Sequence, residues 1–244
     1  MKTLVIIPSR LSATRLPGKP LLKINGLSII SHVFKKAEEA NIGEVVVATE
    51  DQEIMDDIKK NGGRAILTGK NHKTGTDRIY EALQKIGNSN FDLVMNLQGD
   101  EPLMNVDDIR QLNNLMIANN CHLGTLASKI SDIELYENQN VVKVITKEKL
   151  NNSNFPEAIN FMRIISEQYE NIYHHLGIYC YKKEILKKFI SCDQSSNEIK
   201  NNLEQFRAID NKIKINVALA KASPIGVDTE EDFVAIKKIM EYKS

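Results

Sequence analysis

The chain has 244 residues, of which 42% are hydrophobic, and its 32 basic residues balance 32 acidic ones. A balanced charge excludes a global electrostatic field that would attract nucleic acid or an anionic membrane. The apolar run before Pro8 is too short for a signal peptide, no apolar segment is long enough to span a bilayer, and the three cysteines lack metal-ligand spacing. We therefore expect a soluble, cytoplasmic protein that binds neither nucleic acid nor a membrane.

The first expected strand, residues 4–7, runs into a loop that carries three cations. Pro8 fixes its own φ and lacks an amide donor, so the strand should end there. Arg10, Arg15 and Lys19 follow, at the carboxyl end of a buried strand, where open α/β sheets bind ligands. The loop therefore indicates a phosphate site, with an ordinary surface turn as the alternative. It lacks the glycine patterns of dinucleotide-binding dehydrogenases and P-loop NTPases, which argues against both classes.

Strands and helices alternate along the first hundred residues. Apolar spacing predicts helices at residues 29–40, 52–60 and 74–86. Short apolar runs predict buried strands at residues 44–49, 65–68 and 93–97. This order predicts an α/β fold with a mostly parallel sheet and helices on both faces.

The alternation loosens beyond residue 120. Strands are expected at residues 123–130, 141–146, 158–162, 176–181 and 213–220, with few helices between them. Helices are expected at residues 198–209 and 230–242. We interpret the chain as a single domain, residues 1–244, with a small strand-rich arm at about residues 123–195.

Two aspartates follow glycine turns. Asp100 comes directly after the strand at residues 93–97, and Asp228 precedes the last helix. Magnesium favours one or two carboxylates together with substrate phosphates, so both are candidate metal ligands. Two carboxylates ~4 Å apart repel by roughly 4 kcal/mol at an effective dielectric of 20, so pairing them needs a cation or a proton between them. The alternatives are a turn cap for Asp100 and a helix N-cap for Asp228.

A third loop, residues 72–78, leads into the helix at residues 74–86. The backbone amides at that helix N-terminus, together with Thr74 and Arg78, can read a base edge or a ribose. Thr-Gly-Thr-Asp is also an ordinary capping sequence, and that alternative stays open.

Six motifs occur in one order along the chain. The first, which begins at Ile7, is Ile-Pro-Ser-Arg-x3-Thr-Arg-Leu-Pro-Gly-Lys-Pro-Leu. The others are His-x-Thr-Gly-Thr-Asp-Arg, Leu-Gln-Gly-Asp-Glu-Pro, His-Leu-Gly-Ile-Tyr-x-Tyr, Leu-Glu-Gln-Phe-Arg and Gly-Val-Asp-Thr. Together they closely resemble the 3-deoxy-manno-octulosonate cytidylyltransferase family, from about Leu4 to Phe233. The resemblance implies a three-layer α/β/α nucleotidyltransferase fold with a mixed, mostly parallel sheet. It also implies a homodimer whose arm helps to build the interface.

The same resemblance implies a role for individual residues. The triphosphate of CTP would be bound by Arg10 and Lys19, which with the aspartates form the catalytic set. The nucleotide would also be held by Pro8, Ser9, Thr74, Gly75, Arg78 and Gln98. Magnesium, the implied cofactor, would be bound by Asp100 and Asp228. The sugar acid would be surrounded by Arg163, His175, Tyr179, Glu204 and Gln205.

The implied reaction is CMP transfer from CTP to the anomeric hydroxyl of 3-deoxy-D-manno-octulosonate (Kdo), which yields CMP-Kdo for lipopolysaccharide synthesis and pyrophosphate. The chain departs from the family pattern after Arg163, where the second arginine that is usual in the family is missing. Glu167 and Glu170 stand nearby and would favour an acceptor with an amine. The alternatives are therefore a cytidylyltransferase for 8-amino-Kdo or a nonulosonic acid, and a nucleotide sensor without catalysis.

Overall fold

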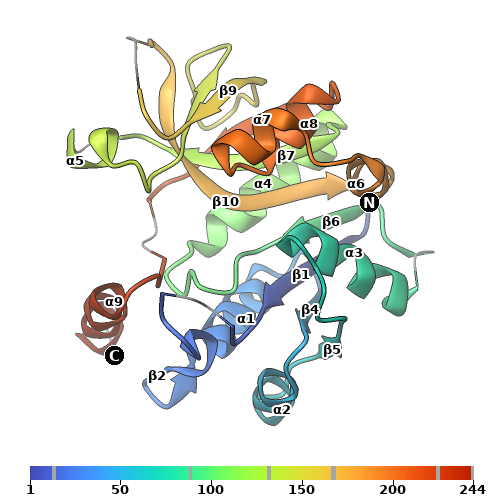
Figure 1. Ribbon diagram of the computed structural model, residues 1–244, viewed down its shortest axis with the longest axis vertical. Coiled ribbons are helices and arrows are strands. Elements are labelled where there is room, and N and C mark those ends of the chain that lie inside the picture. Colours follow the sequence, from blue (N-terminus) through green and yellow to red (C-terminus); the bar gives the residue numbers. More distant parts are fainter. Residues whose placement is uncertain (13–14, 88–89, 131–132, 166–168, 224–225, 243–244) are drawn as a thin grey trace. The chain divides into compact units, whose positions relative to one another are not determined.

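The computed structural model describes residues 1–12, 15–87, 90–130, 133–165, 169–223 and 226–242 (Figure 1). The chain divides into two compact units. The first unit comprises residues 2–109 and 224–244, and the second comprises residues 110–223 with Met1. None of the helices in the described ranges combines the length and the apolar character that a bilayer crossing requires.

A parallel sheet forms the centre of the first unit. Its strands are β1 (Thr3–Ser9), β4 (Gly43–Thr49), β5 (Ala65–Leu67) and β6 (Leu93–Asn96), in the order β6-β1-β4-β5. Val5 of β1 lies opposite Val45 on one side and Met95 on the other. Residues 4–7 are buried, as expected of a parallel strand that is covered on both faces.

The helices of the first unit agree with the apolar spacing of the sequence. They are α1 (Ile29–Ala40), α2 (Gln52–Lys60), α3 (Gly75–Ile86) and α9 (Glu230–Tyr242), with a short 3₁₀ turn η1 (Lys19–Leu21) and a small hairpin of β2 (Lys23–Ile24) and β3 (Leu27–Ser28). Helix α1 begins where Ser28 accepts a hydrogen bond from the Ser31 amide, and it ends at Asn41, which has a φ of 50°. The predicted helices of this unit are confirmed.

The second unit carries a mixed sheet. Its strands are β7 (Leu123–Ser128), β8 (Lys143–Thr146), β9 (Ala158–Met162), β10 (Ile172–Lys182) and β11 (Ile215–Leu219). Strand β11 pairs parallel with β7, whereas β7–β10, β10–β8 and β8–β9 are antiparallel. The predicted α/β class with a mostly parallel, mixed sheet is confirmed, and the arm at residues 123–195 of a single domain stays a prediction.

The helices of the second unit depart from the expectation. They are α4 (Val106–Asn119), most of which belongs to this unit, α5 (Ile133–Glu137), α6 (Lys183–Ser191), α7 (Ser196–Asn201) and α8 (Gln205–Asp210). The expected single helix at residues 198–209 is wrong. Asn202 has a φ of 51°, a left-handed conformation that ends α7 and separates it from α8. Beyond residue 120, the expectation of few helices between the strands missed α5 and α6, and no helix was predicted at the position of α4.

Candidate active site

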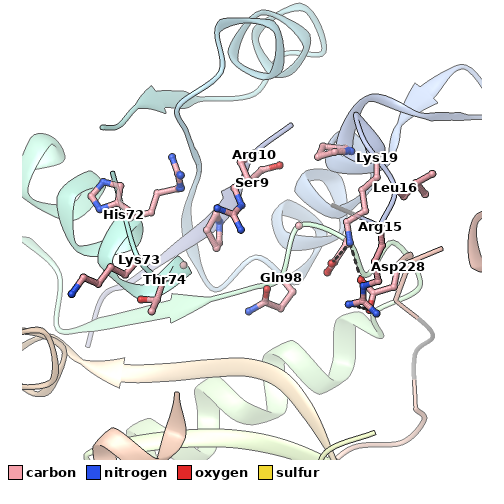
Figure 2. Close-up of a pocket in the computed structure, with 16 residues that line it drawn as sticks. Ser9, Arg10, Arg15, Leu16, Lys19, His72, Lys73, Thr74, Gln98 and Asp228 are labelled. Atoms are coloured by element: carbon pink, nitrogen blue, oxygen red, sulfur yellow. Dashed lines mark hydrogen bonds and ion pairs between the residues drawn. The ribbon is translucent and has the colours of Figure 1, made fainter. Parts of the chain in front are cut away.

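A pocket of about 340 Å³ opens in the first unit, at the carboxyl ends of its strands. Figure 2 shows side chains that approach it from the loop after β1, from the loop before α3, from the end of β6 and from the start of α9. The pocket is lined by all eight predicted nucleotide-binding residues and both predicted metal ligands: Pro8, Ser9, Arg10, Lys19, Thr74, Gly75, Arg78, Gln98, Asp100 and Asp228. Arg15, His72 and Lys73 also line it, and Arg15 and Lys73 raise its positive charge.

The close approach of two strand ends shapes the floor of the pocket. Ile6 of β1 lies opposite Asn96 of β6, so the segments after these strands leave the sheet side by side. A Cβ atom at Gly99 would lie 3.0 Å from the Pro8 carbonyl oxygen and 3.0 Å from Ile30 Cδ1. Glycine therefore lets the two segments approach closely without a tight contact at this turn, and the turn presents Asp100 to the loop after β1.

Lys19 joins the two aspartates. Its Nζ donates hydrogen bonds to Asp100 Oδ2 at 2.7 Å and to Asp228 Oδ1 at 3.1 Å, and also to the Val227 carbonyl at 2.6 Å. Burial lowers the pKa of Lys19, but the charges and hydrogen bonds of the two aspartates outweigh burial and raise it. Lys19 is therefore an ammonium at neutral pH, and it supplies the cation that a pair of carboxylates needs.

Asp228 is available to this pair because another residue caps α9. The Thr229 hydroxyl accepts a hydrogen bond from the Asp232 amide at 3.2 Å, and Asp232 Oδ2 accepts from the amides of Thr229 at 2.9 Å and Asp228 at 3.1 Å. The alternative interpretation of Asp228 as the helix cap is wrong. Its carboxylate instead binds Lys19 and, at 3.0 Å, the Arg15 guanidinium.

The donor set of Asp100 and Asp228 fits a divalent cation, because both carboxylates already converge on one ammonium. Within the described ranges, no group of three or more His, Cys, Asp or Glu side chains could hold a metal. A magnesium ion would therefore need substrate oxygens to complete its coordination, which is its usual mode at phosphate-transfer sites. Beside the pair, burial and the charges of Asp100 and Asp228 raise the pKa of Glu101 to about 8. The Glu101 carboxyl is mostly protonated at pH 7 and adds little negative charge.

Arg78 is held at the wall of the pocket by two residues that sequence reasoning missed. Its guanidinium, in a residue only 3% exposed, donates to Thr68 Oγ1 at 2.7 Å and forms an ion pair with Glu50. Glu50 and Thr68 come directly after β4 and β5, and this position at the carboxyl end of a parallel sheet was the available signal. The buried ion pair fixes the orientation of Arg78.

The loop before α3 is tied to the helix by Glu81. Its Oε2 accepts from the Gly69 amide at 2.8 Å and contacts His72 Nε2, and its Oε1 contacts Lys85 Nζ at 2.7 Å. Partial burial acts to raise the pKa of Glu81, but the hydrogen bonds from Lys85, Gly69 and His72 outweigh it and lower that pKa to about 2. Thr74 caps the helix in a capping box with Asp77, so the capping interpretation holds alongside a position in the pocket.

Glu81→Gln should destabilise the protein at neutral pH by about 1–3 kcal/mol, because charge-assisted hydrogen bonds to the loop are lost. A carboxyl with a lowered pKa stabilises the folded state above its unfolded pKa of 4.5, and the effect fades as the pH falls toward 2. The difference between the free energies of unfolding of wild type and variant, measured with urea at pH 7 and pH 3, should shrink at pH 3. A difference that is constant with pH would contradict the assignment.

The residues predicted to surround the sugar acid all lie in the second unit. Arg163 follows β9 and donates to the carbonyls of Gln139, Asn140 and Asn202 at 3.3–3.5 Å. Sequence reasoning missed Lys143, whose side chain is 0% exposed and whose Nζ donates to the Asn138 carbonyl at 2.6 Å and the Arg163 carbonyl at 2.9 Å. Lys143 therefore fixes the backbone on which Arg163 stands.

His175 and Tyr179 share a buried cluster of rings. Their ring centroids are 5.4 Å apart, and the His175 ring meets Phe161 edge-on at 5.1 Å. His175 Nε2 is 3.0 Å from Thr125 Oγ1. Burial and the charge of His174 lower the pKa of His175 to about 3, so the imidazole is neutral at pH 7. It can offer a hydrogen bond to a substrate but no positive charge.

Glu204 and Gln205 lie at the start of α8, where Glu204 is the N-cap residue. Burial raises the pKa of Tyr179, and the charges of Tyr181 and Glu204 raise it further. Arg207, two residues beyond Gln205, forms a buried bidentate pair with Glu198 at 2.6 and 2.9 Å. The charge of Arg207 is therefore neutralised within the protein, which leaves Arg163 as the better candidate for a carboxylate.

Comparison with known proteins agrees with this geometry. The cytidylyltransferase family model matches residues 4–215. A 3-deoxy-manno-octulosonate cytidylyltransferase from Rhodopseudomonas palustris (strain BisB18) is 40% identical over 99% of this chain and 98% of its own length. The enzyme of the same name from Thermodesulfovibrio yellowstonii is 39% identical over 98% of both chains.

Solved structures show the same fold. A CMP:2-keto-3-deoxy-manno-octonic acid synthetase complexed with CTP covers all of both chains with a TM-score of 0.90 and 32% identity. A UDP-glucose pyrophosphorylase complexed with UDP-glucose reaches a TM-score of 0.73 at 14% identity, which shows the nucleotidyltransferase fold alone. From the family model, the near full-length relatives and the pocket, the chain belongs to the 3-deoxy-manno-octulosonate cytidylyltransferase family of nucleotidyltransferases.

Proposed function

We propose that the chain transfers CMP from CTP to the anomeric hydroxyl of Kdo, which yields CMP-Kdo for lipopolysaccharide synthesis and pyrophosphate. The observation that carries this proposal is the pocket of the first unit, where Arg10 and Lys19 stand beside Asp100 and Asp228. Cations for a triphosphate and carboxylates for a metal are the parts that nucleotidyl transfer requires. The relatives named for this reaction support the same conclusion.

Arg10 and Lys19 would bind the triphosphate, because both cations line the pocket on the side of the loop after β1 (Figure 2). The cytidine would lie against the residues at the other wall and floor: Pro8, Ser9, Thr74, Gly75, Arg78 and Gln98. The backbone amides at the N-terminus of α3 favour a polar ligand there. Arg78, fixed by Glu50, would present donors of constant geometry to the nucleotide.

The hydroxyl of the acceptor would attack the α-phosphorus of CTP in line. A new oxygen–phosphorus bond forms, the bond to the bridging oxygen breaks, its electron pair leaves with pyrophosphate, and the hydroxyl proton is released. The protein contributes mainly by positioning the reactants and by neutralising charge. Arg10 and Lys19 would stabilise the negative charge that grows on the pyrophosphate. Asp100 and Asp228 would hold magnesium, which would supply Lewis-acid stabilisation of phosphate charge and would activate the attacking hydroxyl.

On the acceptor side, Arg163 would bind the sugar-acid carboxylate, since a bidentate guanidinium is the strongest single partner for that group. His175, Tyr179, Glu204 and Gln205 would supply uncharged and acidic hydrogen-bonding groups for the sugar hydroxyls. These residues lie together in the second unit on β10 and at the start of α8. From the family resemblance we also propose that the protein is a cytoplasmic homodimer. Size-exclusion chromatography with light scattering would measure its molar mass and so test the dimer.

The alternatives are less well supported. The relatives carry the name of the Kdo enzyme, which does not favour 8-amino-Kdo or a nonulosonic acid as the acceptor. Glu167, one of the two acids that suggested an amine, lies outside the described residues. A nucleotide sensor would have no need of Asp100 and Asp228 beside the phosphate-binding cations.

Pyrophosphate release tests the proposal directly. The purified chain should release pyrophosphate from CTP and magnesium when Kdo is present, and far more slowly with 8-amino-Kdo or a nonulosonic acid. Replacing CTP with UTP or ATP should lower kcat/KM strongly. Release with a nonulosonic acid and none with Kdo would overturn the acceptor assignment, and no release with any sugar acid, despite CTP binding, would support the sensor.

A further inference from the structure

Lys19 lies where a shared cation of the two aspartates must lie. Its Nζ is 2.7 Å from Asp100 Oδ2 and 3.1 Å from Asp228 Oδ1, and Figure 2 shows the ammonium directed at Asp228. The Lys19 side chain is only 13% exposed, whereas that of Asp228 is 46% exposed. The ammonium is therefore the inner partner of the pair, on the shielded side of the carboxylates.

One backbone conformation and two hydrogen bonds to backbone carbonyls hold Lys19 in this position. Gly18 precedes it with a φ of 70°, a left-handed conformation that glycine adopts at no steric cost and that directs the chain into η1. The Lys19 amide donates to the Leu16 carbonyl at 3.2 Å, and its Nζ donates to the Val227 carbonyl at 2.6 Å. Because the ammonium has backbone as well as carboxylate partners, its place between the aspartates is built into the fold.

An ammonium and a divalent cation compete for this position. Lys19 already binds Asp100 Oδ2 and Asp228 Oδ1, and a second cation held by the same two carboxylates would lie a few ångströms from the ammonium and be repelled by it. A triphosphate offers the ammonium several negatively charged oxygens in exchange. Lys19 can therefore leave the aspartates at little cost only when a polyphosphate is present.

We infer that Lys19 blocks the divalent-cation position of the Asp100–Asp228 pair in the nucleotide-free protein, and that CTP opens the pair by drawing the ammonium onto its phosphates. This inference rests on the proposed function and extends it, because it makes nucleotide and metal binding mutually dependent. Metal would then enter only where a nucleotide is in place. The exchange would also deliver Lys19 to the phosphates, where the reaction needs a cation.

Arg15 provides a matched control for charge. It pairs with Asp228 through the other oxygen, Oδ2, at 3.0 Å, and its side chain is 61% exposed. Arg15 therefore contributes the same charge to the pocket as Lys19. Among the ion pairs of the described residues, however, Arg15 pairs with Asp228 and not with Asp100. Removing Arg15 changes the field around the aspartates, whereas removing Lys19 also vacates the shared position.

The first experiment measures Mn²⁺ binding without nucleotide, by the loss of the free-ion signal in electron paramagnetic resonance. Lys19→Met should bind Mn²⁺ at least about ten-fold more tightly than wild type, the change expected when a charge-assisted hydrogen bond no longer competes. Arg15→Met should gain at most about three-fold, as expected for an exposed ion pair. Adding Asp100→Asn to Lys19→Met should abolish the gain. Lys19→Gln repeats the measurement with a polar side chain if the methionine variant does not fold.

The second experiment follows the ammonium itself. In EDTA, CTP should shift the ¹⁵Nζ resonance of Lys19, whereas cytidine, which lacks phosphates, should leave it in place. Equal Mn²⁺ affinities of wild type and the folded Lys19 variants, or an unchanged resonance with CTP bound, would overturn the inference. Pyrophosphate release by wild type is measured separately. Absent release would count against the proposed function, whereas the Mn²⁺ and CTP binding results would still test the inference about Lys19.

Discussion

Asp100→Asn should lower kcat for pyrophosphate release by a factor on the order of 10²–10³, the range seen when one charge-stabilising group is removed from an active site. The side chain keeps its size, but the amide cannot serve as an anionic metal ligand. Its loss also leaves Lys19 with Asp228 as its remaining carboxylate partner among the described contacts. Steady-state kinetics would measure the loss, and urea unfolding would verify that the variant is folded.

Calorimetry tests the proposed metal-binding role of Asp100 separately from a general effect on the pocket. Magnesium should strengthen CTP binding to wild type and much less to Asp100→Asn. Asp56→Asn is the matched control, because Asp56 is an exposed residue of α2 outside the pocket, and its variant should keep the wild-type kcat. The same magnesium-dependent gain in CTP affinity for Asp100→Asn and wild type would refute the assignment.

Arg163→Ala should raise the KM for Kdo by about 10- to 150-fold, because a charge-assisted hydrogen bond to a carboxylate contributes about 1.5–3 kcal/mol. The partners of the Arg163 guanidinium among the described residues are backbone carbonyls, so a carboxylate can bind it without breaking an ion pair. The KM for CTP should change little, since Arg163 lies outside the pocket of the first unit. Initial-rate kinetics with each substrate varied in turn would separate the two constants.

Two variants sharpen the Arg163 prediction. Lys143→Met should raise the KM for Kdo in the same direction, because the Lys143 ammonium holds the Arg163 carbonyl. Arg64→Ala removes an exposed arginine that pairs with Glu44, and it should leave both KM values unchanged. Tight use of Kdo by Arg163→Ala would show that another group binds the carboxylate.

Local features of the sequence predicted much of the first unit. The apolar spacing at residues 29–40 and 52–60 and the acidic first turn of α9 reproduce the observed helices, because a helix depends on residues three or four positions apart. The sequence also placed the cationic loop and Asp100 directly after strands, and the loops after β1 and β6 lie side by side because these neighbouring parallel strands end at one edge of the sheet. All predicted nucleotide residues accordingly line one pocket.

Contacts between distant residues were decided by the tertiary structure. Glu50 and Arg78 are 28 positions apart, and Lys19 and Asp228 are 209 apart, so no local pattern could pair them. The break between α7 and α8 depends in part on Asn202, whose left-handed backbone a helical apolar spacing does not exclude. The charge states of buried titratable groups were also decided by the tertiary structure. The protonated Glu101 and the neutral His175 follow from burial and neighbouring charges, which exist only once the chain has folded around them.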